Sequence, residues 1–132
     1  MVYSKDSKKT ILVSGAAGFI GSLLALKLIK EGFRVIGVDN LNNYYSVYLK
    51  EARLSFISKE DLSKENWVFY QISIEDKSKL EDIFEKEKID YVVNLAAQAG
   101  VRNSLKKPFD YVNSNLVGFL NVLELCRNFK IK

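Results

Sequence analysis

Three evenly spaced glycines stand between two apolar segments near the start of the chain. They are Gly15, Gly18 and Gly21 of SGAAGFIGS, with ILV before them and LLALKLI after them. This context predicts a turn from a strand into a helix. Gly15 permits the sharp turn, Gly18 leaves no Cβ between the backbone and a bound pyrophosphate, and Gly21 lets the helix pack closely on the sheet. Free amides at a helix start bind anions, although a tight turn without a ligand explains the same spacing.

A carboxylate follows these glycines after a second apolar run. Asp39 stands 18 residues after Gly21, at the end of VIGV. A carboxylate at this place accepts hydrogen bonds from both ribose hydroxyls of an adenosine and repels a 2′-phosphate, which favours NAD over NADP. Asp39 is also suited to begin a side-chain turn before Asn40, and that role is compatible with binding a ribose.

The amino-acid composition excludes several kinds of catalytic and metal-binding site. The chain has 132 residues, the length of one domain, and it has no histidine, which excludes catalytic Ser/His or Cys/His pairs and His-dependent metal sites. Its one cysteine, Cys126, cannot form an internal disulfide. No apolar run approaches the roughly 18 residues that span a bilayer, and the polar start lacks the apolar core of a secretory signal. We therefore expect a cytoplasmic protein without membrane contact.

The net charge of +4 does not arise from a basic patch. Lysines in the segment 75–88 alternate with acidic residues, a pattern typical of a solvated helix face with i,i+4 pairs. A nucleic-acid interface would combine a basic stripe with interleaved aromatic residues. We therefore expect no nucleic-acid partner.

Short β-rich runs alternate with helical periodicity along the chain. The runs predict strands over 10–15, 33–39, 67–73 and 89–97, and the periodic segments predict helices over 19–31, 46–58, 76–88 and 109–128. Gly32 is placed to end the first helix and Pro108 to begin the last. Four strands, each followed by a helix, imply an α/β fold with a doubly wound parallel sheet. Ligands of such sheets bind beyond the carboxyl ends of the strands.

Apolar positions in the helices indicate which sides face the sheet. The side chains expected to pack inward are Leu24 and Leu28, then Tyr48, Leu49, Ala52 and Phe56, and then Leu80, Ile83 and Phe84. In the last helix, Asn115 shares a face with Phe119, Val122 and Cys126. A buried amide there must be hydrogen-bonded, either near a ligand or to a loop carbonyl as a structural clamp.

Four long segments carry a family resemblance. They are ILVSGAAGFIGS, VIGVDNLNNYYSVYLKEARL, NLAAQAGVRNSLKKPFDYV and NSNLVGFLNVLELCR, and their glycines form GxxGxxG where the common dehydrogenase fingerprint is GxGxxG. From about Thr10 onward the chain resembles the extended short-chain dehydrogenase/reductase family of nucleotide-sugar epimerases and dehydratases. DNLNNYY, AAQAGVR and SNLVGFLNVLE are most similar to bacterial UDP-glucuronate 4-epimerases, and they include loop residues that packing alone does not dictate.

The resemblance implies a set of cofactor-binding residues for NAD. The implied set is Gly15, Gly18, Phe19, Ile20 and Gly21 at the pyrophosphate, Asp39, Asn40, Asn42, Asn43 and Tyr44 around the adenosine ribose, Ser73 and Ile74 at the adenine, and Leu95, Ala96, Ala97, Gln98, Ser114 and Asn115 on the nicotinamide side. Arg102 and Asn103 would lie on the substrate side. Ordinary strand-end alanines at 96 and 97, and an exposed loop arginine at 102, remain alternatives.

The chain departs from the family pattern at four positions and lacks one motif. Ser14 replaces threonine, Leu23 and Asn94 each replace a histidine, and Ser73 replaces an aspartate that would accept from the adenine amino group. The catalytic Tyr-x-x-x-Lys of the family, in which the tyrosine is the general base, occurs at none of the seven tyrosines. We therefore expect residues 1–132 to be the N-terminal part of an NAD-binding domain, with no catalytic residue of its own.

The family's reaction defines the expected function and its alternatives. The resemblance implies 4-epimerisation of a UDP-sugar, UDP-glucuronate to UDP-galacturonate, through a 4-keto intermediate, with NAD regenerated and the intact enzyme a homodimer. A dehydratase or decarboxylase of the same family is an alternative. A non-catalytic NAD-binding module is another, and an unpaired edge of its fourth strand would pair with another chain.

Overall fold

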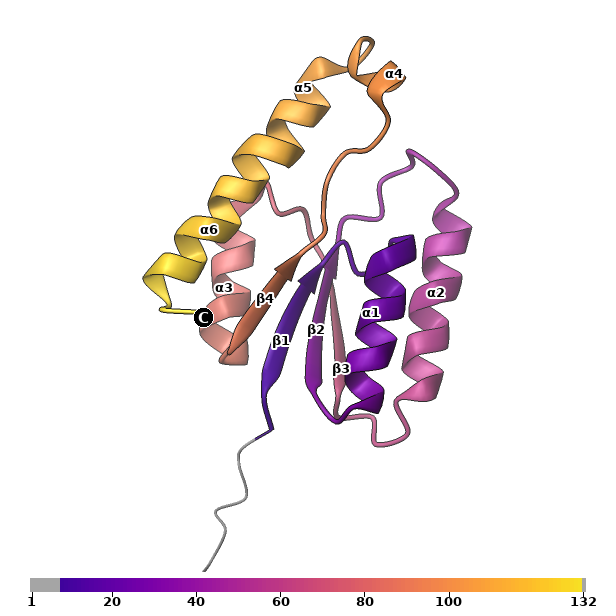
Figure 1. Cartoon of the computed structure of the whole chain (residues 1–132), viewed down its shortest axis with the longest axis vertical. Helices are drawn as coiled ribbons and strands as arrows, with labels where there is room; N and C mark the ends of the chain where they lie inside the picture. Colours follow the sequence, from indigo (N-terminus) through magenta and orange to yellow (C-terminus); the bar gives the residue numbers. More distant parts are fainter. Residues whose placement is uncertain (1–7, 132) are drawn as a thin grey trace, which may run out of the picture.

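A four-stranded sheet with helices on both faces makes up the computed structural model, which describes residues 8–131 (Figure 1). In chain order the elements are β1 (Thr10–Ser14), α1 (Phe19–Lys30), β2 (Arg34–Asp39), α2 (Val47–Glu60), β3 (Trp67–Gln71), α3 (Lys77–Glu87), β4 (Tyr91–Asn94), α4 (Val101–Ser104), α5 (Pro108–Tyr111), the π-helix η1 (Val112–Gly118) and α6 (Phe119–Asn128). All strand pairs are parallel, in the order β3-β2-β1-β4. The predicted α/β fold with a doubly wound parallel sheet is confirmed. The strand order reverses beside β1, where such sheets bind ligands.

Alternating strand residues fill two cores, one on each face of the sheet. Leu12 and Ile36 pair in the register and point with Val38 toward the side covered by α3 and α6. Val13 and Val35 point to the opposite side, which α1 and α2 cover (Figure 1). Because both faces are covered, these strands are continuous apolar runs, and that is why the sequence revealed them.

The predictions for α1 and α3 agree with the structure in most respects. Leu80, Ile83 and Phe84 are at most 4% exposed, as expected. Gly32 has φ of +92° just after α1 and so supplies the left-handed residue that ends it. The deepest residues of α1 are Ala25 and Ile29, while the predicted Leu24 and Leu28 are half-buried at the margin of the same core.

The prediction for the inward face of α2 is wrong. Tyr48 is 81% exposed and Phe56 is 53% exposed, and Leu49 and Ala52 are exposed as well. The buried residues of α2 are Lys50 and Ile57. The side of α2 that carries Lys50 and Ile57 faces the fold, and the Lys50 ammonium donates to the carbonyl oxygen and Oδ1 of Asn42, so a charged residue occupies a buried position of this helix.

The last strand and the last helix differ from their predicted forms. β4 ends at Asn94 rather than Ala97: the Leu95 amide is shared between the carbonyl oxygen and the hydroxyl of Ser14, at 3.2 and 3.1 Å, and the Ala96 amide donates to the hydroxyl alone, at 3.2 Å. The predicted helix over 109–128 is interrupted by η1, and the short α4 was not predicted.

The π-turn also changes which residues face inward. Val122 is buried and Cys126 half-buried, as predicted, and burial raises the pKa of the Cys126 thiol. Asn115 and Phe119, predicted on the same inward face, are exposed. A π-helix has more residues per turn than an α-helix, so the inward face passes through Gly118 and then Ser114 instead. Within residues 8–131, no helix is long and apolar enough to cross a membrane.

Candidate functional site

One pocket lies over the carboxyl ends of the strands and has a volume of about 200 Å³. Thirteen of the residues predicted to bind the cofactor line it: Gly15, Gly18, Asp39, Asn40, Asn42, Tyr44, Ser73, Ile74, Leu95, Ala96, Ala97, Gln98 and Ser114. These residues come from five separate stretches of the chain, brought together by the sheet order. The fold therefore gathers most of the predicted site in one place.

The glycine-rich turn forms the floor of this pocket. Gly15 has φ of +71°, and a Cβ there would lie 2.9 Å from the backbone of Leu95 and Ala96. A Cβ on Gly21 would lie 2.0 Å from the Gly15 carbonyl oxygen, so only glycine lets α1 approach the turn this closely. No side chain caps the start of α1 at Gly18. The first amides of the helix are thus available to an anionic group.

The Asp39 carboxylate joins the glycine-rich turn to the loop that follows β2. Its Oδ2 accepts from the Ala17 amide at 3.1 Å, and its Oδ1 accepts from the Leu41 amide at 2.9 Å. The second bond is the side-chain turn that the sequence suggested for Asp39. Each carboxylate oxygen can accept further bonds, and Asp39 lines the pocket, so the turn leaves room for a diol.

Ser14 fixes the turn at the end of β4. Its hydroxyl donates to Asn94 Oδ1 and accepts from the amides of Leu95 and Ala96. Ser14 is fully buried at the end of β1, beside Asn94 of β4. The Ser14 hydroxyl thus bonds the chain where it leaves β4. A hydroxyl group is also what serine shares with threonine, the residue common at this position in the family.

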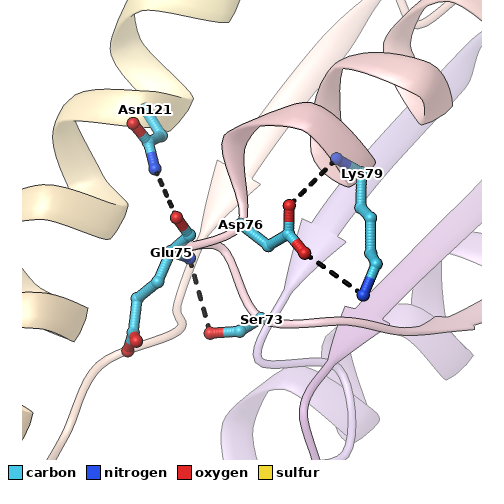
Figure 2. Close-up of polar contacts among 5 residues, drawn as sticks. All are labelled: Ser73, Glu75, Asp76, Lys79 and Asn121. Carbon is cyan, nitrogen blue, oxygen red and sulfur yellow. Dashed lines mark hydrogen bonds and ion pairs between the residues drawn. The ribbon is translucent and has the colours of Figure 1, made fainter.

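The residues after β3 form the wall that the resemblance assigns to adenine. Ile74 is 4% exposed, and a Cβ on Gly118 would lie 2.7 Å from its side chain. Asn121 Nδ2 donates to the carbonyl oxygens of Ile74 and Glu75, at 3.0 and 3.1 Å. Figure 2 shows the Asn121 contact from α6, together with the Ser73 hydroxyl, which accepts from the Glu75 amide at 3.4 Å. Asn121 of α6 and the Ser73 hydroxyl therefore both bond the backbone of this wall.

A cap on α3 continues the same segment. The Asp76 carboxylate accepts from the Lys79 amide and pairs with the Lys79 ammonium, both at 3.2 Å (Figure 2). The bond from the Lys79 amide is the main cause that lowers the pKa of Asp76. The cap fixes the direction in which the chain leaves Ser73 and Ile74.

The loop after β4 is held by two side chains of the last helical region. Asn115 Oδ1 accepts from the Gln98 amide at 2.7 Å, and Asn115 Nδ2 donates to the Gln98 carbonyl at 3.1 Å. The Tyr111 hydroxyl lies 2.8 Å from the Ala99 carbonyl oxygen. Asn115 is therefore the loop clamp that the sequence left as one of two alternatives, and it stands beside the pocket rather than in its lining.

Seven predicted site residues lie outside the pocket lining. Phe19 and Ile20 have side chains 69% and 66% exposed, although the prediction concerned their backbone. Gly21 is buried against the turn, and Asn43 is exposed in the loop after β2. Arg102 is exposed and Asn103 half-buried on the short helix α4, and Asn115 is bonded to the Gln98 backbone beside the pocket. The structure brings neither Arg102 nor Asn103 to the pocket.

Sequence reasoning missed five residues that line the pocket. They are Val38, Tyr45, Lys50, Ile72 and Ala99. Lys50 is the most informative, because it is only 5% exposed and its burial lowers the pKa of the ammonium, partly offset by the charge of Asp39. Its position in the stripe of Lys50, Leu54 and Ile57, at helical spacing, was the signal that could have revealed it.

The arrangement fits a dinucleotide better than a metal ion. It offers an uncapped helix start, an anchored carboxylate at the end of the neighbouring strand β2 and a wall that includes Ile72 and Ile74, which are parts suited to a pyrophosphate, a ribose and a base. Within residues 8–131 no group of three His, Cys, Asp or Glu side chains could hold a metal. The fold and the site together define a Rossmann-type α/β unit.

Comparisons with known proteins give this class a family. Residues 12–132 match the family model described as GDP-mannose 4,6 dehydratase. The chain is 53% identical over 122 residues to Protein CapI of Staphylococcus aureus, and 50% identical over 121 residues to a UDP-glucuronate 4-epimerase of Thermodesulfobacterium geofontis. Each alignment covers 92% of this chain and 35% or 36% of the relative. The chain belongs to the NAD-dependent epimerase/dehydratase family.

Solved structures give the same result. A UDP-glucose 4-epimerase of Thermotoga maritima superposes with a TM-score of 0.75 at 39% identity, over 93% of this chain and 35% of that one. The Bifidobacterium longum UDP-glucose 4-epimerase, solved with NAD+ and UDP, has a TM-score of 0.79 at 28% identity, over 94% and 35%. The chain therefore spans about a third of the length of these relatives and corresponds to their N-terminal portion.

Proposed function

We propose that this chain is the NAD-binding portion of a nucleotide-sugar 4-epimerase that converts UDP-glucuronate to UDP-galacturonate. The observation that carries the proposal is the pocket in which the start of α1 and the Asp39 carboxylate face one space. The UDP-glucuronate part rests on similarity to relatives of that name. A dehydratase or decarboxylase of the same family remains the alternative.

Each part of the pocket has a task in this proposal. The amides at the start of α1 bind the pyrophosphate, Asp39 binds the adenosine ribose, and Ile74 lies against the adenine. Ala96, Ala97 and Gln98, with Ser114, line the nicotinamide side. When bound, the nicotinamide would take a hydride from the sugar and return it.

The family resemblance supports tasks for the remaining predicted residues. The backbone of Phe19, Ile20 and Gly21 belongs to the pyrophosphate end. Asn115 acts through Gln98, and Arg102 and Asn103 are assigned to the sugar side. Because no tyrosine of this chain has a lysine four residues later, residues 1–132 bind the cofactor without turning over a sugar nucleotide. The UDP-sugar site and the homodimer belong to the longer enzyme in this proposal.

Calorimetric titration of the purified chain with NAD and with NADP tests the proposal. We expect NAD to bind at least about tenfold more tightly, because Asp39 accepts from the ribose hydroxyls and repels a 2′-phosphate. UDP-glucuronate added with NAD should give no UDP-galacturonate by NMR. No heat of binding from NAD on a chain whose circular dichroism shows it folded would refute the cofactor role.

An enzyme-level experiment tests whether this chain can serve as the cofactor-binding part of a UDP-glucuronate 4-epimerase. A protein that joins this chain to the remaining two thirds of the Thermodesulfobacterium geofontis UDP-glucuronate 4-epimerase should convert UDP-glucuronate to UDP-galacturonate. The epimerase proposal fails if this hybrid protein folds and binds NAD but forms no UDP-galacturonate, while the intact Thermodesulfobacterium geofontis enzyme forms it under the same conditions.

A further inference from the structure

Two cationic side chains lie on one face of α2: Lys50 lines the pocket, and Arg53 reaches the glycine-rich turn. Lys50 is buried and Arg53 is half-buried, and they stand three residues apart, which places them on the same side of the helix. The family resemblance gave neither residue a role. Both contact segments that also contact the Asp39 carboxylate.

Lys50 is bonded to the loop that follows β2. Its ammonium donates to the carbonyl oxygen of Asn42 at 2.9 Å and to Asn42 Oδ1 at 3.0 Å, and it lies 4.6 Å from the centre of the Tyr45 ring. A buried ammonium is costly unless such partners replace water. The loop residue before Asn42 is Leu41, whose amide donates to Asp39. Lys50 and Asp39 thus hold adjacent residues of one loop.

Arg53 is bonded to the glycine-rich turn. Its Nη1 donates to the Ala17 carbonyl at 3.2 Å and to the Tyr45 hydroxyl at 2.9 Å. The amide of the same Ala17 donates to Asp39. Asp39 therefore bonds the amide of Ala17 and Arg53 bonds its carbonyl oxygen. The Tyr45 ring lies near both Arg53 and Lys50.

The Asp39 carboxylate and the two cations therefore bond the same two segments, the glycine-rich turn and the loop after β2. We propose that Lys50 and Arg53 form a two-cation brace that positions the Asp39 carboxylate and the glycine-rich turn for the adenosine and pyrophosphate of the cofactor. Lys50 and Arg53 are positioning residues in this inference, which rests on the proposed NAD site. The two positive charges also offset the charge of Asp39 at the place where phosphates approach.

Amide hydrogen exchange measures the brace without any cofactor. In Lys50→Met we expect exchange of the Leu41 amide to speed up by about tenfold, the range of a hydrogen bond to a charged group. In Arg53→Met the Ala17 amide should respond more strongly than the Leu41 amide. Lys59→Met is the matched control, because it removes an exposed lysine from the same helix and should change neither amide.

NAD titration of the same variants measures the consequence for binding. We expect Lys50→Met to raise the Kd for NAD by roughly tenfold, and Lys50→Arg to restore most of the affinity because it keeps the charge and the donors. A residue needed only to fill space would be replaced better by methionine than by arginine. The brace is refuted if Lys50→Met matches Lys59→Met in exchange and in affinity.

The two arms separate this inference from the function on which it rests. If the unsubstituted chain does not bind NAD, the proposed function fails, while exchange at Leu41 and Ala17 still decides whether the brace exists. If Lys50→Met does not fold, Arg53→Met and Lys50→Arg carry the test. Equal exchange at Leu41 and Ala17 in Arg53→Met and in the unsubstituted chain would then overturn the inference.

Discussion

The two ends of the pocket are held in different ways. At the Asp39 end, comprising the glycine-rich turn, Asp39 and the loop up to Ser46, contacts come from strand ends fixed by the sheet register and from the buried Lys50. At the Gln98 end, comprising residues 97–100 and η1, the contacts are side-chain bonds of Asn115 and Tyr111 to a loop backbone, and one bond joins the two ends, from Asn42 Nδ2 to Gln98 Oε1 at 3.3 Å. Asn115 is exposed, whereas Lys50 is 5% exposed.

This difference bears on how binding energy divides between the ends. The bonds of Asp39 and Lys50 at the Asp39 end are part-buried beside covered strands, where water competes less, so substitutions of these residues should affect folding and affinity strongly. Bonds at the Gln98 end are open to solvent, and each contributes less. We therefore expect the Asp39 end to be preformed and the Gln98 end to tolerate change.

Gly21→Ala should have the largest effect and should act on folding itself. The added Cβ would lie 2.0 Å from the Gly15 carbonyl oxygen and 3.2 Å from the Ala16 Cα, both backbone atoms that cannot rotate away. We expect a loss of about 3 kcal/mol in the free energy of unfolding, measured by urea denaturation.

Gly32→Ala is the matched control for this glycine. It lies at the other end of α1 with φ of +92° and no atom within 4 Å of the added Cβ, so only backbone strain of about 1 kcal/mol applies. An equal loss in the two variants would contradict the claim that close packing at the Asp39 end requires Gly21.

Asp39→Asn should have the largest effect on affinity with the fold retained. Asparagine keeps one acceptor for the Leu41 or Ala17 amide but loses the charge and an oxygen. We expect the Kd for NAD to rise roughly 10- to 100-fold and the preference for NAD over NADP to shrink, measured by calorimetry. Asp82→Asn, on the exposed face of α3, should leave both unchanged. A preserved preference in Asp39→Asn would show that another group selects against the 2′-phosphate.

The strands and the Asp39 end could be predicted because their signals are local. Uninterrupted apolar runs predicted β1 and β2. The glycine spacing together with Asp39 predicted the glycine-rich turn and the carboxylate beside it. Lys50 could not be predicted in the same way. Its helical spacing with Leu54 and Ile57 is a local signal, but its partners Asn42 and Tyr45 are not part of that pattern, and a scale of hydrophobicity places lysine outside.

The Gln98 end was predicted less well because its shape depends on distant residues. The π-turn brings Gly118 against Ile74, 44 residues earlier in the chain, and no local pattern in VNSNLVG indicates a widened helix. Regular α-helical periodicity therefore predicted that Asn115 faces inward, which is wrong. Of the two roles left open for its amide, near a ligand or as a loop clamp, the loop clamp agrees with the structure. The early end of β4 depends similarly on Ser14, 80 residues before Asn94.

Asn115→Ala should weaken binding at the Gln98 end alone. It removes two bonds to the Gln98 backbone, which are open to solvent, so we expect the Kd for NAD to rise by only about threefold. Affinity for ADP, which lacks the nicotinamide half, should not change. Asn113→Ala, an exposed neighbour on the same helix, is the control. Equal losses for ADP and NAD in Asn115→Ala would mean that the two ends are coupled.

Ser73→Asp should have the smallest effect, and it should increase affinity. The Ser73 hydroxyl accepts from the Glu75 amide (Figure 2). One oxygen of an aspartate can keep this turn while the other faces the pocket that Ser73 lines. Because Asn121 and Gly118 fix Ile74 beside it, the new carboxylate would point at a defined place, where it can accept from the adenine amino group.

The gain from Ser73→Asp is limited by charge, because Glu75 and Asp76 are close and oppose a third carboxylate in the segment. We expect about a threefold lower Kd for NAD, roughly half a hydrogen bond to a charged group, and no gain for the hypoxanthine dinucleotide, which has no amino group there. Ser78→Asp, on the exposed side of α3, adds the same charge away from the pocket and should not change affinity. An equal gain for both dinucleotides would show that the carboxylate acts on the loop and not on the base, and the adenine wall would then owe its selectivity to shape alone.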